Sequence, residues 1–108
     1  MKKIINHAKI YCVDNENKEE IGYLQLIQTD NLPVYELEYW LDEEYHNKGI
    51  MSARLPIYLQ ELKEKSIIKL MALVEEGNEA SIKLLKKNNF IELCEPKEGL
   101  KCFINNLN

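Results

Sequence analysis

The most regular alternation of apolar and polar residues in the chain runs from Val34 to Leu41. Positions 35, 37, 39 and 41 hold tyrosine or leucine, whereas the positions between them hold Glu36, Glu38 and Trp40. Successive side chains of an extended strand point to opposite faces, so a period of two separates these two sets. The segment is therefore predicted to be a strand with one apolar face.

Two further strands are predicted before this segment, over Lys9–Val13 and Glu20–Gln28. The polar run at positions 14–17 separates them, and an Asp-Asn-Leu-Pro turn at 30–33 ends the second. Short apolar runs joined by short polar turns are typical of antiparallel strands that are neighbours in a sheet. We therefore expect the first three strands to form a meander.

The pattern becomes helical at about Ile50 and stays so to Lys65. Apolar residues recur at the spacing of one helix face, namely Met51, Leu55, Tyr58, Leu59 and Leu62. Pro56 lies inside this pattern and lacks a backbone donor. It is therefore expected to kink the helix or to perturb its first turns.

A nearly continuous apolar run follows the helix, from Ile67 to Val74, interrupted by Lys69. Runs of this kind are typical of strands that are buried on both faces. A strand, a helix and a buried strand in succession form a right-handed βαβ unit. Val34–Leu41 and Ile67–Val74 are therefore expected to be parallel.

A second helix is predicted from Asn78 to about Asn89. Asn78 suits the N-cap, and Asn89 suits the left-handed conformation that ends a helix. Phe90–Cys94 and Leu100–Ile104 then form a closing hairpin. The order β-β-β-α-β-α-β-β predicts an α/β (α+β) fold, in which a mixed, mostly antiparallel sheet contains a central parallel βαβ unit. One domain over residues 1–108 is expected.

Composition and charge narrow the classes of function. The 108 residues include 14 lysines and arginines and 18 aspartates and glutamates, for a net charge of −4. Without a basic stripe, a nucleic-acid partner is not expected. No apolar run is long enough to span a bilayer, and the first apolar run is interrupted too early for a signal peptide, so a cytoplasmic location is predicted. The three cysteines lack Cys-x-x-Cys spacing, and neither a disulfide framework nor a metal site is expected.

The turn that enters the first helix has the properties of an anion site. In a parallel βαβ unit, the helix begins beside the carboxyl end of the first strand, where its first N–H groups and the positive end of its dipole point outward. Gly49 allows the backbone to approach a phosphate closely, and His46 and Lys48 can add positive charge. A single glycine after a strand is more often a simple turn residue, so this pattern alone leaves both interpretations open.

Two longer segments resemble the GNAT N-acetyltransferases. In that family, the loop before the coenzyme-binding helix reads Arg or Gln, two residues, Gly, one residue, and then Gly or Ala. The corresponding residues here are His46, Gly49 and Met51, so the first glycine matches and the other two positions depart. Met51 followed by Ser52 is similar to the ribosomal-protein alanine N-acetyltransferase branch. The block Asn78–Phe90 resembles the later helix of the family.

The resemblance implies a site for acetyl-CoA, used as a co-substrate. Backbone donors of the turn and of the helix start would hold its pyrophosphate, and Asn78 would contact the pantetheine arm. On this basis, the predicted coenzyme-binding residues are Leu41, Asp42, His46, Asn47, Lys48, Gly49, Ile50, Met51, Ser52, Asn78 and Ser81.

The resemblance also suggests catalytic groups. In the family, a tyrosine seven residues after the helix asparagine often protonates the departing thiolate, but Leu85 holds that position here. Ser81 is the remaining candidate, as in the ribosomal-protein branch, or else it is a first-turn hydroxyl without a chemical role. Glu36 and Glu38 are candidate bases if their face borders the acceptor site, and otherwise form a solvated face. A backbone N–H near residues 40–42 is expected to hold the thioester carbonyl.

Complete GNAT domains begin with a strand and one or two helices that wall the acceptor site, and no such helix is predicted before Lys9. An N-terminally abbreviated fold is therefore expected. Its acceptor side is open, completed by a second subunit in a homodimer, or lost. One predicted function is acetyl transfer from acetyl-CoA to a primary amine, with a cationic acceptor favoured by Glu36 and Glu38. The alternative is a non-catalytic module that binds coenzyme A or a partner.

Overall fold

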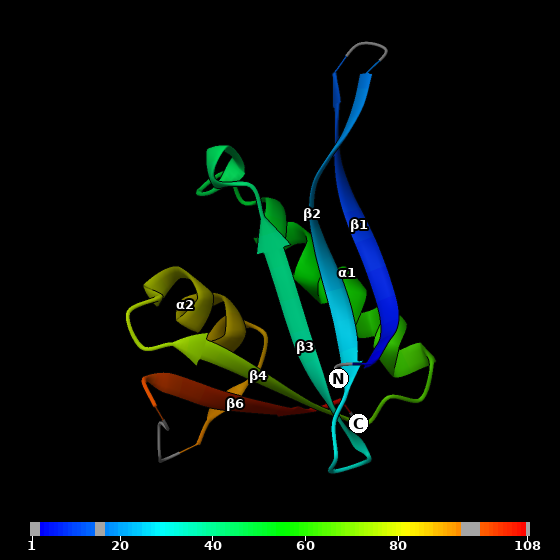
Figure 1. Cartoon of the computed structure of the whole chain (residues 1–108), viewed down its shortest axis with the longest axis vertical. Helices are drawn as coiled ribbons and strands as arrows, with labels where there is room; N and C mark the ends of the chain where they lie inside the picture. Colours follow the sequence, from blue (N-terminus) through cyan, green and yellow to red (C-terminus); the bar gives the residue numbers. More distant parts are fainter. Residues whose placement is uncertain (1–2, 15–16, 94–97, 108) are drawn as a thin grey trace.

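This computed structural model describes residues 3–14, 17–93 and 98–107. Within these residues, the fold consists of six strands in one sheet and two α-helices (Figure 1). In space, the strands follow the order β1-β2-β3-β4-β6-β5. Along the chain, the elements are β1 (Lys3–Asp14), β2 (Asn17–Gln28), β3 (Val34–Leu41), a short 3-10 helix (Glu43–Tyr45), α1 (Ile50–Glu64), β4 (Lys69–Glu75), α2 (Glu79–Lys87), β5 (Ile91–Glu92) and β6 (Leu100–Asn106).

The order of the elements, the meander of β1 to β3 and the span of β3 agree with the sequence prediction. β1 is longer than predicted, because it begins at Lys3 rather than at Lys9 and pairs with β2 from there onward. Asn6 and His7 concealed this extension, since they interrupt the apolar pattern. The pairing shifts register between Ile4 and Asn6, and such an irregularity lets one strand keep its ladder despite an extra residue.

β3 and β4 are parallel, and the other neighbouring strands are antiparallel. The predicted mixed sheet with one parallel pair is therefore confirmed. The parallel pairing joins Val34–Glu36 to Lys69–Met71 and ends there. Beyond these residues the two strands diverge, which Figure 1 shows as a V between them. Beyond Glu36 and Met71, the backbone N–H and C=O groups on the facing edges of β3 and β4 therefore do not pair with each other.

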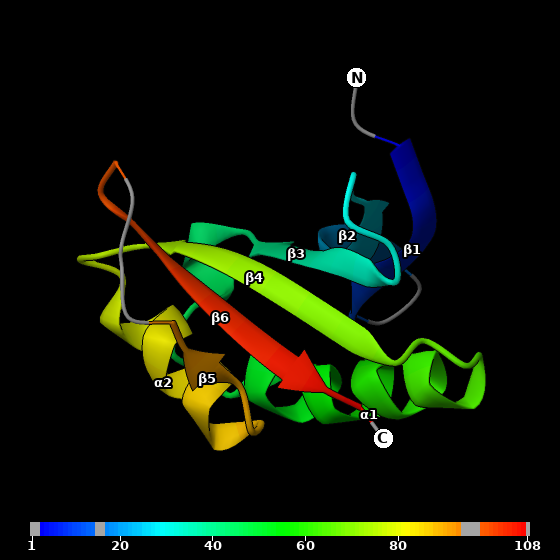
Figure 2. The same cartoon turned by 90° about the horizontal axis from the view of Figure 1, so that it is seen from below.

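Both helices cover the same face of the sheet, below it in Figure 2. We call this the closed face, and the opposite one, which carries Glu36, Glu38 and Trp40, the open face. The hydrophobic core lies between the closed face and the helices. Its largest fully buried side chains come from strands and helices alike: Phe103, Ile21, Leu24, Leu26, Leu55, Leu62, Leu70 and Leu85.

The prediction that the strand after α1 is buried on both faces is wrong. Leu70, Ala72 and Val74 of β4 are buried on the closed face, but Leu73 between them is 44% exposed. The reason is that α1 and α2 lie on one side of the sheet (Figure 2). Because side chains alternate along a strand, every second side chain of β4 is turned away from the helices.

α1 starts at the predicted residue and ends within one residue of the prediction. The helix continues through Pro56, which is exposed. Its predicted apolar stripe packs on the closed face, where Leu55, Tyr58, Leu59 and Leu62 are buried. The Tyr58 hydroxyl also donates a hydrogen bond of 2.5 Å to the Asn6 side chain, which links α1 to β1.

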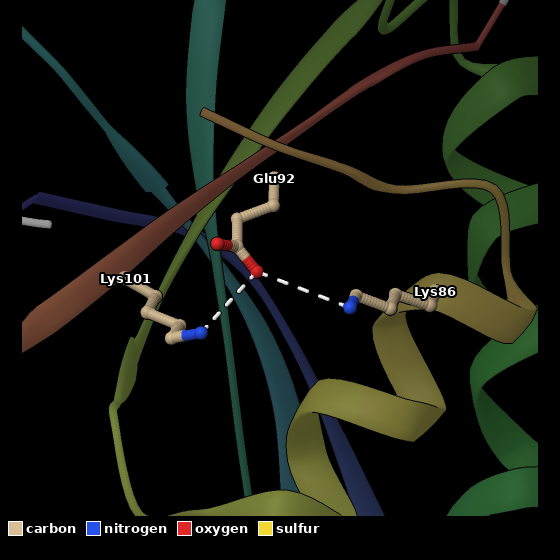
Figure 3. Close-up of polar contacts among 3 residues, drawn as sticks. All are labelled: Lys86, Glu92 and Lys101. Atoms are coloured by element: carbon tan, nitrogen blue, oxygen red, sulfur yellow. Dashed lines mark hydrogen bonds and ion pairs between the residues drawn. The ribbon is translucent and has the colours of Figure 1, made fainter. Parts of the chain in front are cut away.

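α2 begins and ends as predicted. The Asn78 side chain accepts a hydrogen bond of 3.2 Å from the Ser81 N–H, and Asn89 has a φ of 69°. β5 and β6 form the predicted closing hairpin, although Cys94 lies outside the described residues. Glu92 of β5 joins α2 to this hairpin, because its carboxylate lies 4.0 Å from Lys86 and 3.5 Å from Lys101 (Figure 3).

Candidate functional site

The chain enters α1 through a turn with two residues in the left-handed region, Asn47 at φ 61° and Gly49 at φ 75°. The N–H groups of residues 50–52 precede the first intrahelical bond, which ends on the Gly49 carbonyl, so they have no acceptor within the helix. Gly49 supplies no capping side chain, and the first turn carries no acidic residue. This helix end therefore keeps outward donors and a positive potential that favour an anion.

Hydrogen bonds to the end of β3 hold this turn in place. The Asp42 N–H donates to the Ile21 carbonyl of β2 at 2.7 Å. His46 lies against the Leu41 carbonyl, with 2.8 Å between Nε2 and the oxygen. Because a carbonyl can only accept, His46 carries its proton on Nε2 in this bond. The arrangement gives His46 a role in shaping the turn rather than that of a base.

A cleft of about 330 Å³, the first cavity, lies over this helix end. Of the predicted coenzyme-binding residues, all line it except Asp42 and Lys48. Lys48 instead places its ammonium 5.5 Å from the centre of the Tyr45 ring. The cleft also includes five residues that are not in this predicted coenzyme-binding set: Tyr39, Trp40, Tyr45, Ala80 and Leu84.

A second cavity of about 570 Å³ lies where β3 and β4 diverge. Its walls are residues 36–40 of β3, residues 72–75 of β4, and Tyr23, Asn78 and Ser81. The two cavities share Tyr39, Trp40, Asn78 and Ser81. The first and second cavities therefore adjoin at the V between β3 and β4. The second cavity is lined by carboxylates of the open face.

Comparison with known proteins decides the family. Residues 3–91 match the family model described as acetyltransferase (GNAT) domain. The chain belongs to the GNAT acetyltransferase family. No curated protein matches the chain.

In the part of the chain that the structure describes, no helix has the length and apolar character needed to cross a membrane.

Solved structures share this GNAT-like fold at low sequence identity. A domain from Methanocaldococcus jannaschii is 21% identical, with a TM-score of 0.78 over 91% of this chain and 64% of that one. Ribosomal-protein-S5-alanine acetyltransferase from Vibrio fischeri is 22% identical, with a TM-score of 0.74 over 83% and 56%. The candidate acetyltransferase yncA from Salmonella typhimurium, solved with its cofactor acetyl-CoA, is 19% identical, with a TM-score of 0.73 over 82% and 59%. The chain thus spans less than two thirds of each of these proteins.

The predicted site residue Ser81 is paired with a tyrosine. Its Oγ lies 2.6 Å from the Tyr39 hydroxyl. Burial raises the pKa of Tyr39 above its usual 10, and the hydrogen bond with Ser81 offsets part of this rise. The sequence prediction placed Tyr39 on the apolar face of β3, as a residue of the core or of a cleft wall. Its position near the carboxyl end of a parallel strand, where ligands of open α/β sheets bind, is the signal that favours a role in a site.

Leu85 occupies the place of the usual GNAT tyrosine. Its side chain is fully buried in the core under α2 and lines neither cavity, whereas the preceding Leu84 lines the first. Position 85 therefore supplies no hydroxyl group to either cavity.

Glu36 and Glu38 line the second cavity and not the first. Glu38 accepts a hydrogen bond of 2.9 Å from the Gln25 amide, and the Gln25 oxygen lies 2.8 Å from His7 Nδ1. The His7 ring stacks on Tyr23 at 5.1 Å. We call this hydrogen-bonded chain of His7, Gln25 and Glu38 the Gln25 relay. The sequence did not reveal it, because it depends on the register that places the three residues directly opposite one another on three strands.

Proposed function

We propose that this GNAT chain is an N-acetyltransferase that moves the acetyl group of acetyl-CoA to a primary amine. One observation carries the proposal: Tyr39, Trp40, Asn78 and Ser81 line both cavities at the V between β3 and β4. A transferase must bring its two substrates to one point in the correct orientation. A ligand in the first cavity would meet a ligand in the second at these residues.

The first cavity suits the coenzyme. The N–H groups of Ile50, Met51 and Ser52 match the chemistry of a pyrophosphate. Asn78 caps α2 through its amide oxygen, so its amide nitrogen remains a donor for carbonyls of the pantetheine arm. Asp42 and Lys48 lie outside the cleft, and their contribution is limited to the shape of the turn and to long-range charge.

A backbone donor is available for the thioester carbonyl. The Asp42 N–H points to β2, since it donates to Ile21. Backbone N–H groups alternate between the two edges of a strand, so the Leu41 N–H points to the other edge, where β3 faces the V. Leu41 also lines the first cavity. We therefore assign its N–H to the developing oxyanion.

The second cavity suits a cationic acceptor. Glu36 and Glu38 line it together with Glu75, and Tyr23 and Trp40 add aromatic walls. Carboxylates and aromatic faces both attract an ammonium group. In this assignment, Glu36 or Glu38 accepts the proton that the amine loses, and the Gln25 relay orients Glu38.

Direct attack in a ternary complex is favoured over an intermediate acylated on Cys102. Burial, followed by the charge of Glu36, raises the pKa of the Cys102 thiol above its usual 9. The thiolate is the nucleophilic form of cysteine, so a raised pKa makes Cys102 a poor nucleophile at neutral pH. Cys102 also lines neither cavity.

A non-catalytic coenzyme-binding module is the second candidate. Leu85 in place of the usual tyrosine favours it, because this buried side chain offers no proton donor to either cavity. In a transferase, a second subunit of a homodimer would add wall to the second cavity. Sedimentation of the protein at micromolar concentration tests that arrangement.

Calorimetry with acetyl-CoA tests the first cavity, with Ser52→Glu and Ala53→Glu as a matched pair. Both residues are exposed neighbours in α1, but only Ser52 lines the cleft. A carboxylate at position 52 faces the phosphates and should weaken binding by about tenfold or more. It should not weaken the helix, because acidic residues suit a first turn. Absent binding at high micromolar coenzyme, or equal losses in both variants, would refute the assigned site.

A thiol-release assay with acetyl-CoA and a panel of amines separates the two candidate functions. Release with a diamine or a peptide N-terminus supports the transferase, and coenzyme binding without release supports the module. Glu38→Gln should lower kcat/KM more for a diamine than for a neutral amine of similar size, because it removes a charge from the acceptor cavity. Equal effects on the two amines would remove Glu38 from acceptor recognition.

A further inference from the structure

We propose that Tyr39 is the general acid of the transfer, which gives its proton to the coenzyme A sulfur as the thioester breaks, and that Ser81 is the positioning residue for its hydroxyl. This assignment depends on the transferase function proposed above. It replaces the expectation that Ser81 itself is the proton donor.

The position of Tyr39 is the first reason. Its backbone belongs to the part of β3 that no longer pairs with β4, so its side chain lies at the V and not deep in the sheet. The phenol reaches Ser81 in the first turn of α2, and both residues line both cavities. A thioester in the first cavity would approach an amine from the second beside this pair.

The choice among the residues at the junction is the second reason. Of the four that line both cavities, Trp40 and Asn78 have no O–H group. Ser81 has one, but an alcohol is a much weaker acid than a phenol. Tyr39 is therefore the strongest proton donor among the residues that the two cavities share.

The other tyrosines at the site fit the role less well. Tyr45 lines the first cavity only, and its pKa is raised to about 12, first by a hydrogen bond with the Cys12 side chain. Tyr23 lines the second cavity only. Tyr39 alone, among the described tyrosines, borders both.

The protonation state of Tyr39 agrees with an acid. Burial raises its pKa above 10, so the phenol keeps its proton at neutral pH, and the Ser81 hydrogen bond keeps the rise smaller than burial alone would make it. A neutral phenol is a hydrogen-bond donor to the sulfur as the thioester breaks. The hydrogen bond from Tyr39 would stabilise the charge that develops on sulfur, and the Ser81 hydrogen bond would stabilise the tyrosinate after the proton moves.

The step balances without a further reagent. The amine nitrogen forms a bond to the acetyl carbon, the bond from that carbon to sulfur breaks, and the electron pair stays on sulfur. Tyr39 gives its proton to that sulfur. The nitrogen loses one proton to Glu36, Glu38 or water, and an equivalent proton returns to the Tyr39 oxygen from solvent. The products are an amide and the free thiol of coenzyme A.

Tyr39→Phe tests the proposal, and Tyr35→Phe is the matched control. Tyr35 lies on the same face of β3 and is also partly buried, but it lines neither cavity. We expect Tyr39→Phe to lower kcat for thiol release by about a hundredfold or more, the size of effect that a positioned acid supplies. Tyr35→Phe should retain the wild-type kcat.

Binding provides a readout that does not depend on turnover. If the Tyr39 hydroxyl donates to the coenzyme sulfur, coenzyme A at a pH near 9, where much of it is thiolate, should bind Tyr39→Phe about tenfold more weakly than wild type. Desulfo-coenzyme A, which has no sulfur, should bind both proteins equally. Equal affinity of coenzyme A for both proteins would contradict the assigned contact.

Ser81→Ala tests the positioning role. Loss of its hydrogen bond should raise the pKa of Tyr39 further, which is measured as the tyrosinate absorbance that the Tyr39→Phe variant lacks. An unchanged titration would remove Ser81 from this role, as would an unchanged kcat.

The outcomes separate this proposal from the proposed function. A wild-type protein that releases no thiol with any amine overturns both. An active wild type with an equally active Tyr39→Phe variant overturns the Tyr39 assignment alone. Should Tyr39→Phe unfold, the coenzyme and desulfo-coenzyme comparison is made with Ser81→Ala, where a selective loss for coenzyme A supports the pair and equal losses refute it.

Discussion

The two faces of the sheet differ in composition and in role. On β3, Leu37 is 2% exposed against the helices, whereas its neighbours Glu36 and Glu38 lie on the opposite face and line the second cavity. The same contrast recurs on β4, where Ala72 is buried and Leu73 is not. One face therefore supplies the burial that stabilises the fold. The other face buries fewer apolar side chains, Ile27 among them, and carries carboxylates and aromatic rings.

Polar side chains that are buried on the open face have hydrogen-bond partners, which removes the cost of burying them. Gln25 is only 7% exposed there, and its side chain is bonded on one side to His7 and on the other to Glu38. Among the described residues, no buried side-chain nitrogen or oxygen lacks a hydrogen-bond partner. Tyr39 departs from the simple division, since it starts from the closed face and reaches the site because β3 leaves its parallel neighbour.

Replacement of one large side chain on each face by alanine should give the largest difference in stability between the two faces. Phe103→Ala on the closed face should lower the free energy of unfolding by about 3–5 kcal/mol, through lost burial and a cavity. Leu73→Ala on the open face should lower it by less than about 1 kcal/mol, because the side chain is already partly in water. Chemical denaturation measures both. Similar losses would show that the open face is covered in solution.

Tyr58 of α1, which is buried in the core, offers a test by pH. Burial raises the pKa of Tyr58, with the charge of Glu61 as a smaller cause. A raised pKa in the folded state stabilises the fold fully below the unfolded value near pH 10, and this contribution is lost as the pH rises above it. Stability should therefore fall above pH 10 and fall less steeply in Tyr58→Phe. The exposed Tyr11→Phe is the control, and it should follow the wild-type curve.

The rim of the closed face should show the smallest effect. Glu92→Gln breaks the contacts with Lys86 and Lys101 that link α2 to the hairpin (Figure 3). Because these side chains are partly exposed, the loss in stability should be about 0.2–1 kcal/mol and should shrink in high salt. Glu20→Gln, at the more exposed pair with Lys9, should change less. A loss above that range would mean that the ion pair organises the hairpin.

The sequence by itself determined the helices and strands that depend on neighbouring residues alone. The apolar and polar alternation of Val34–Leu41 predicted β3, because successive side chains of a strand point to opposite faces with the same period of two. Asn78 and Asn89 set the limits of α2 through capping and the left-handed conformation. Gly49 marked the helix start that the first cavity surrounds. The segment around Gly49 and the block Asn78–Phe90 were enough to indicate the GNAT family, which the family model confirms.

Only the tertiary structure decided which residues meet. β4 looked buried on both faces, since a run of apolar residues does not state on which side the helices lie. The relay from His7 to Glu38 exists because three strands share one register. The contact between Tyr39 and Ser81 exists because β3 and β4 separate after three paired positions, which no local pattern encodes. Such contacts arise from the packing of distant segments, so their chemistry appears only when the chain is folded.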